Sequence, residues 1–174
     1  MPTDINDFLN PLQIIARGYN GVFEPSAVCY EEAAENVSQE YRRKVRIISR
    51  SLNALRRVPG VLNPFRNTRH WFLLVSHKVL RWFAPFFMIF CFASSLALWG
   101  APLYKTAVIL QAAFYALALI GWNWRPGNKI GKLLSLVFYF CMVNLASLVG
   151  CVKCFRGDLS GIWAPPRQKL QNQA

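Results

Sequence analysis

Acidic and basic residues of the N-terminal half have the types and spacing best suited to chemistry. Asp7 stands before a run, 8–17, whose apolar residues recur at helical spacing and which Gly18 ends. A carboxylate at the start of a helix interacts favourably with the helix dipole. Carboxylates also act as general bases in catalysis. Arg43 and Arg46 lie one helical turn apart, so both can reach one phosphate group or face lipid headgroups. Taken alone, the pattern favours a dipole interaction for Asp7 and contact with lipid headgroups for the two arginines.

The two arginines belong to a predicted amphipathic helix over 41–58. Apolar residues form one stripe at spacings of three and four, namely Tyr41, Val45, Ile48, Leu52 and Leu55. Beside it runs a row of arginines, Arg43, Arg46, Arg50 and Arg57. A second segment, 70–82, also mixes apolar and basic residues. We expect the region 41–82 to form helices in the membrane plane, with their bases toward headgroups.

Three runs in the C-terminal half, within 83–152, contain no charged residue and are long enough to cross a bilayer. They cover 83–103, 106–124 and 133–152, and about 20 residues at 1.5 Å each span roughly 30 Å of hydrocarbon. Aromatic residues at the expected ends suggest an interfacial belt: Trp82, Trp99, Tyr104, Trp122 and Trp124. The chain is 54% apolar and 16% charged, against roughly 25% charged in soluble proteins. These features predict an integral membrane protein.

The net charge of +12 is unevenly distributed. Residues 1–40 hold seven acids and one base, whereas 42–81 hold eleven bases and no acid. A basic block beside apolar runs indicates membrane lipid as its partner and argues against nucleic acid. The positive-inside rule then places the N-terminal part in the cytoplasm. Three crossings would leave the basic tail, 153–174, outside, so either the third run is re-entrant or the rule fails here.

The first forty residues suggest mixed α/β structure. After the short helix, two strands are expected over 21–23 and 27–30. Forty residues with few apolar groups cannot form a core alone, so this piece is expected to be the edge of a larger domain. The five cysteines form no disulfide framework, and Cys151-x-x-Cys154 has no second pair to make a metal site.

Short motifs along the chain resemble the membrane-embedded family-2 glycosyltransferases, the processive polysaccharide synthases that make cellulose, hyaluronan or chitin. The resemblance covers nearly the whole chain but only the C-terminal portion of the family's architecture. The matching segments are Asn6-Asp7-Phe8, Ala16-Arg17-Gly18-Tyr19, Val22-Phe23-Glu24-Pro25, Tyr30-Glu31-Glu32, Arg43-Lys44-Val45-Arg46-Ile47, Ser76-His77-Lys78-Val79-Leu80-Arg81-Trp82 and the tail 156–163.

This resemblance implies a role for each motif residue. Asp7 corresponds to the catalytic base, which takes the acceptor's proton while the anomeric centre inverts. Arg43 and Arg46 correspond to the Gln/Arg-x-x-Arg-Trp motif and would bind the leaving diphosphate. Ile47 stands where the family has tryptophan, so the ring beside the acceptor sugar is missing.

The resemblance also implies an architecture. The expected fold is the α/β edge of a glycosyltransferase A-type domain (1–40), followed by interface helices and about three transmembrane helices, mostly α. The nucleotide-sugar half, where Asp-x-Asp aspartates hold a divalent metal (Mg or Mn), is not represented in 1–174. The expected protein is therefore a fragment of a bacterial inner-membrane glycosyltransferase, inactive alone, whose intact form joins a nucleotide-sugar to a glycan or lipid-linked acceptor. The alternative is a small non-catalytic membrane scaffold or assembly subunit.

Overall fold

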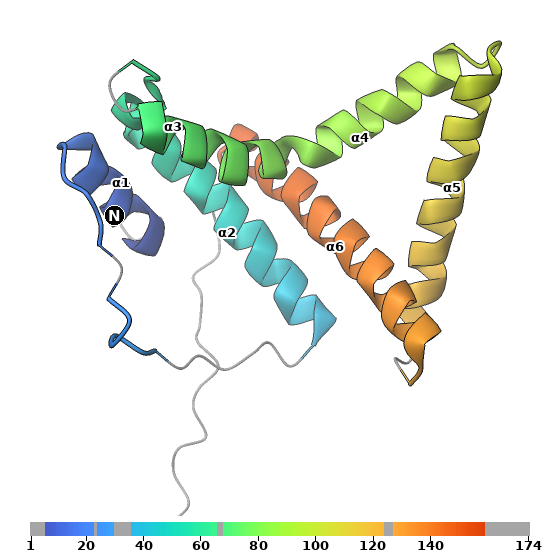
Figure 1. The fold of residues 1–174 in the computed structure, drawn as a ribbon, viewed down its shortest axis with the longest axis horizontal. Helices are drawn as coiled ribbons and strands as arrows, with labels where there is room; N and C mark the ends of the chain where they lie inside the picture. Colours follow the sequence, from blue (N-terminus) through green and yellow to red (C-terminus); the bar gives the residue numbers. More distant parts are fainter. Residues whose placement is uncertain (1–5, 23, 30–35, 66–67, 124–126, 159–174) are drawn as a thin grey trace, which may run out of the picture.

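The computed structural model describes residues 6–22, 24–29, 36–65, 68–123 and 127–158, and every regular element in them is a helix (Figure 1). The order is α1 (Asn6–Ala16), α2 (Val37–Arg57), η1 (Pro59–Leu62), α3 (Thr68–Leu74), η2 (Val75–Val79), α4 (Leu80–Ala97), α5 (Pro102–Asn123) and α6 (Lys129–Arg156). The mostly helical character predicted from the sequence is confirmed. The turn segment 124–126 and most of the expected tail, 159–174, lie outside the described residues.

The short N-terminal helix is confirmed, but the two strands after it are wrong. Gly18 ends α1 with φ of +91°, while the Tyr19 N–H donates to the Ile14 carbonyl at 3.2 Å. In the described part of 21–29 the chain makes turns, and Val22 and Val28 are 93% and 68% exposed. A strand is stable only beside another strand, and the described residues offer none.

The amphipathic helix α2 begins four residues earlier than the apolar stripe predicts. Asn36 caps it, because its side-chain oxygen accepts the Gln39 N–H at 2.9 Å. The predicted stripe faces the interior, with Val45, Ile48 and Leu55 buried. The helix ends before Pro59-Gly60, as predicted.

The second expected interface helix and the first expected span are one continuous helix. Thr68–Ala97 runs for 30 residues through α3, η2 and α4. Five of its residues, Val75–Val79, form a π-helical turn. No break in the helix marks the boundary expected near residue 83. The cluster Ser76-His77-Lys78 lies on the same continuous helix as the apolar segment.

Three helices are long and apolar enough to cross a membrane, which makes this an integral membrane protein. They are Thr68–Ala97, Pro102–Asn123 and Lys129–Arg156, and only 17%, 11% and 28% of their apolar windows are buried within the chain. Phe90 and Leu119 are 74% and 70% exposed. Such surfaces require a lipid or protein environment rather than water.

The long helices α4, α5 and α6 form three sides of a triangle, and α2 lies along α6 (Figure 1). Two glycines allow the closest approaches. A side chain at Gly121 would overlap the Leu134 carbonyl, and one at Gly150 would lie 3.0 Å from the Ile48 Cβ. Small residues are the usual means of bringing helix backbones together in membranes.

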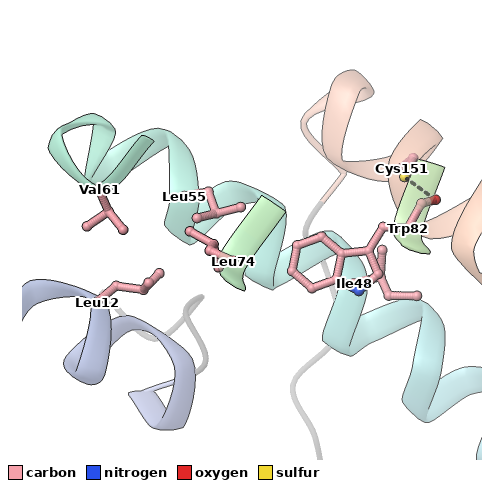
Figure 2. Close-up of a cluster of buried hydrophobic side chains, with 7 residues drawn as sticks. All are labelled: Leu12, Ile48, Leu55, Val61, Leu74, Trp82 and Cys151. Carbon is pink, nitrogen blue, oxygen red and sulfur yellow. Dashed lines mark hydrogen bonds between the residues drawn. The ribbon is translucent and has the colours of Figure 1, made fainter. Parts of the chain in front are cut away.

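A cluster of buried side chains joins the helices where the start of α4 meets the C-terminal part of α6 (Figure 2). Its buried members are Leu12, Ile48, Leu55, Val61, Leu74, Trp82 and Cys151. Trp82 is only 4% exposed, so its predicted place in an interfacial aromatic belt is wrong. The Cys151 thiol donates to the Trp82 carbonyl at 3.6 Å, and the Phe8 ring contacts the indole edge-on at 5.8 Å between centroids.

The contact at Gly121 gives a prediction for stability. Gly121→Val should lower the free energy of unfolding by about 1–3 kcal/mol, because the new side chain overlaps the backbone of α6. Thermal unfolding in detergent, followed by circular dichroism, measures the effect. Ala113→Val on the exposed side of α5 is the matched control and should change little. Equal effects of both substitutions would contradict the close packing of α5 on α6.

Candidate functional site

A groove between α1 and the helix that carries α3 and η2 holds most of the chemically active side chains near the N-terminus. Its volume is about 390 Å³. Asp7, in the first turn of α1, borders one side and is exposed. His70, His77 and Lys78 border it from the facing helix, and apolar side chains complete the lining: Phe8, Pro11, Leu12, Ile15, Val61, Leu73 and Leu74. The groove therefore has a carboxylate beside three basic groups over an apolar floor.

Phe8 fixes the position of Asp7 relative to the facing helix. Its ring accepts a cation–π contact from Lys78, whose Nζ lies 4.9 Å from the ring centroid. The same ring contacts buried Trp82. Because Asp7 precedes Phe8 directly, these contacts hold the carboxylate beside the basic wall.

The hydrogen bonds of Ser76 favour one tautomer of His77. The Ser76 hydroxyl donates its single proton to the Phe72 carbonyl at 2.6 Å. The same hydroxyl lies 2.8 Å from Nδ1 of His77, so there it acts as the acceptor and Nδ1 carries the proton. In the neutral ring, Nε2 then keeps its lone pair. His77 thus offers the groove an acceptor when neutral and a donor when protonated.

The π-helical turn helps to place these groups. A π turn adds a residue to the helical repeat, and such turns occur frequently at functional sites. Val75–Val79 includes His77 and Lys78, while His70 lies two α-helical turns earlier. Both histidines belong to the segment 70–82, which the sequence predicts to lie at the membrane interface, and no sequence partner indicates a general base there. The one sequence feature that pointed to His77 is the segment Ser76-His77-Lys78, which belongs to the motifs that resemble the glycosyltransferases.

Arg43 and Arg46 lie on α2 and do not line the groove of Asp7. Glu40 lies 4.0 Å from Arg43 and 3.3 Å from Lys44. Burial lowers the pKa of the Arg46 guanidinium, and the neighbouring charges of Arg50 and Arg43 lower it further. The row is therefore a set of like charges that an anion would stabilise.

The motif residue Ile47 is half-buried on α2 and, like the arginines, does not line the groove. Of the predicted site residues, Asp7 lines the groove, and Arg43, Arg46 and Ile47 do not.

The divalent metal expected from the resemblance has no ligand set in the part of the chain that the structure describes. No three His, Cys, Asp or Glu side chains there are grouped so as to hold a metal ion. Cys151 and Cys154 are buried with free thiols. The groove's residues therefore do not fit a metal.

Comparisons with protein-family models, curated proteins and solved structures give no match for this chain. The candidate site therefore stands on the geometry of the groove and on the sequence resemblance.

The Ser76–His77 bond predicts a measurable tautomer. With ¹⁵N-labelled histidine, the NMR shifts of neutral His77 should show a protonated Nδ1. Ser76→Ala should move the ring toward the Nε2-protonated form, because the acceptor at Nδ1 is lost. His70 is the internal control and should not change. An unchanged His77 spectrum in Ser76→Ala would contradict the assigned hydrogen bond.

Proposed function

We propose that this chain forms the acceptor side and membrane region of a glycosyltransferase that moves a sugar from a nucleotide-sugar to a glycan or lipid-linked acceptor. One observation supports it above the others. Asp7, which the resemblance marks as the base, lies in a groove formed against the helix that continues into an apolar, membrane-length segment. A lipid-linked or growing glycan acceptor is met at that boundary.

The proposed reaction needs a base beside the acceptor hydroxyl. The hydroxyl oxygen attacks the anomeric carbon and forms the new C–O bond, while the bond to the nucleoside diphosphate breaks and its electron pair leaves with the phosphate. The proton passes to the Asp7 carboxylate. Across the groove, the lone pair on Nε2 of neutral His77 accepts a bond from a sugar hydroxyl.

The leaving diphosphate is assigned to Arg43 and Arg46. Burial lowers the pKa of Arg46 and the neighbouring charges of Arg50 and Arg43 lower it further, so a bound diphosphate offsets the repulsion among these charges. Planar guanidinium groups bind phosphate oxygens in pairs. Ile47 supplies no aromatic ring, so acceptor binding falls to the groove.

The donor-binding residues and the Mg or Mn expected in the intact enzyme belong to the nucleotide-sugar half of the family's architecture. No step is assigned to the metal here, because the groove's residues do not fit one.

The proposed location is the bacterial inner membrane, with α1 and α2 on the cytoplasmic side, where nucleotide-sugars are found. The basic residues of 42–81 support this orientation. The alternative, a non-catalytic scaffold or assembly subunit, is favoured by the largely exposed apolar surfaces of α4, α5 and α6. An activity that depends on Asp7 distinguishes the two functions.

The assignment of Asp7 is tested in native membranes from cells whose gene carries Asp7→Asn. Incorporation of label from a panel of nucleotide-sugars should fall at least a hundredfold, because the amide keeps the shape of the side chain but not its basicity. Asp158→Asn, on an exposed residue past the end of α6, is the control and should retain activity. Full activity of Asp7→Asn, with equal protein in the membrane, would contradict the proposal.

The arginine assignment has its own test. Arg46→Ala should lower transfer about ten- to a hundredfold, since a charge-assisted bond to phosphate contributes roughly 1.5–3 kcal/mol. Arg57→Ala, about three turns further along α2, should have a small effect. Equal, small losses at both positions would assign the arginine row to headgroup contacts instead.

A further inference from the structure

The three long apolar helices form a closed path. At the first corner, the start of α4 contacts the end of α6 through the Cys151 thiol and the Trp82 carbonyl, 3.6 Å apart (Figure 2). At the second corner, α4 meets α5 across the short turn after Ala97. At the third, Gly121 of α5 lies against the Leu134 carbonyl of α6. Figure 1 shows the resulting triangle.

The contacts at the three corners limit how the path can cross a bilayer. Where each corner lies at one of the two faces of the membrane, at least two corners share a face, and the helix between those two does not cross. The triangle then allows two crossings at most, although Thr68–Ala97, α5 and α6 are each long and apolar enough to cross.

The charges at the corners identify the helix that stays on one side. The first corner is rich in cations, contributed by Arg56, Lys78, Arg81, Lys153 and Arg156. The third corner carries Lys129 and Lys132, both exposed in the first turn of α6. The second corner has only Lys105 among the described residues near it. By the positive-inside rule the first and third corners share the cytoplasmic side, and α6 connects them.

We propose that α6 does not cross the membrane but lies along the cytoplasmic leaflet, and that α4 and α5 alone cross as a hairpin. The partner of the α2–α6 pair is then the leaflet itself, with its anionic headgroups. This inference rests on packing and charge and is independent of the glycosyltransferase proposal.

The packing of α2 on α6 supports the in-plane position. Ile48 of α2 contacts Gly150, and Arg56 donates to the Cys154 carbonyl at 3.2 Å while stacking 4.9 Å from the Phe155 ring centroid. These contacts place the arginine-bearing α2 at the same depth as the C-terminal part of α6. A crossing α6 would draw the arginine row toward the hydrocarbon, which is costly for arginine.

The remaining surface of α6 is suited to the leaflet. Its exposed side chains are apolar, including Leu133, Leu136, Phe140, Leu145 and Phe155. Basic residues stand at both ends of the helix, which is about 42 Å long at 1.5 Å per residue. In this position the exposed apolar side chains enter the leaflet, while the long basic side chains at both ends reach the headgroups.

Two methionines allow a test without any substitution. Of the three methionines, Met88 lies in α4 and Met142 in α6. In aligned bilayers of the full chain labelled with ¹⁵N-methionine, solid-state NMR reports how each amide is oriented to the bilayer normal. We expect the Met88 amide to have the shift of a transmembrane helix and the Met142 amide that of an in-plane helix. Transmembrane shifts for both would overturn the proposal.

Labelling from each side of the membrane gives an independent test. Cysteines are introduced singly as Lys105→Cys, Asn128→Cys and Asp158→Cys in the full chain. An impermeant maleimide is applied to right-side-out and inverted vesicles, and mass spectrometry identifies the labelled peptide among those of the native cysteines. Asn128→Cys and Asp158→Cys should react from the same side, and Lys105→Cys from the other. Reaction of Asp158→Cys together with Lys105→Cys would overturn the proposal.

Discussion

The contact between Trp82 and Cys151 is the constraint on which the arrangement depends. Trp82 stands where the basic part of its helix gives way to the apolar part, and its indole is buried against Ile48 and Phe8 rather than placed in a headgroup belt. Burial of one such side chain contributes about 1.5–3 kcal/mol or more. This residue joins α1, α2, α4 and α6, and it closes the triangle of long helices.

The groove follows from the same contact. Phe8 contacts both Trp82 and Lys78, so the helix that carries Asp7 is held against the basic side of the groove. The arginine row of α2 runs beside the apolar stripe of that helix, and Arg43 and Arg46 do not line the groove. A donor that reaches both the base and the arginines must therefore extend beyond the groove.

Sequence patterns predicted most of the helices but not their arrangement. The stripe through Val45, Ile48 and Leu55, the glycine that ends α1 and the three apolar runs depend on local spacing, which the chain shows directly. The predicted position of Trp82 in an interfacial belt was wrong. A tryptophan side chain suits either a membrane interface or a protein core, and only tertiary packing decides between the two. The strands over 21–23 and 27–30 failed for a similar reason, since strand propensity needs a neighbouring strand. His77 lines the groove from a π turn, which periodicity does not reveal.

The continuous helix Thr68–Ala97 connects the groove to the apolar segment. One end borders the groove through His70, His77 and Lys78, and the other lies in the apolar segment that meets α5. Tilting of a membrane helix follows the thickness of the bilayer around it. Because Phe8 of α1 contacts Trp82 and Lys78 of this same helix, a tilt imposed by the lipid moves both sides of the groove together. The thickness of the bilayer thus sets how the groove is oriented to the membrane rather than how wide it is.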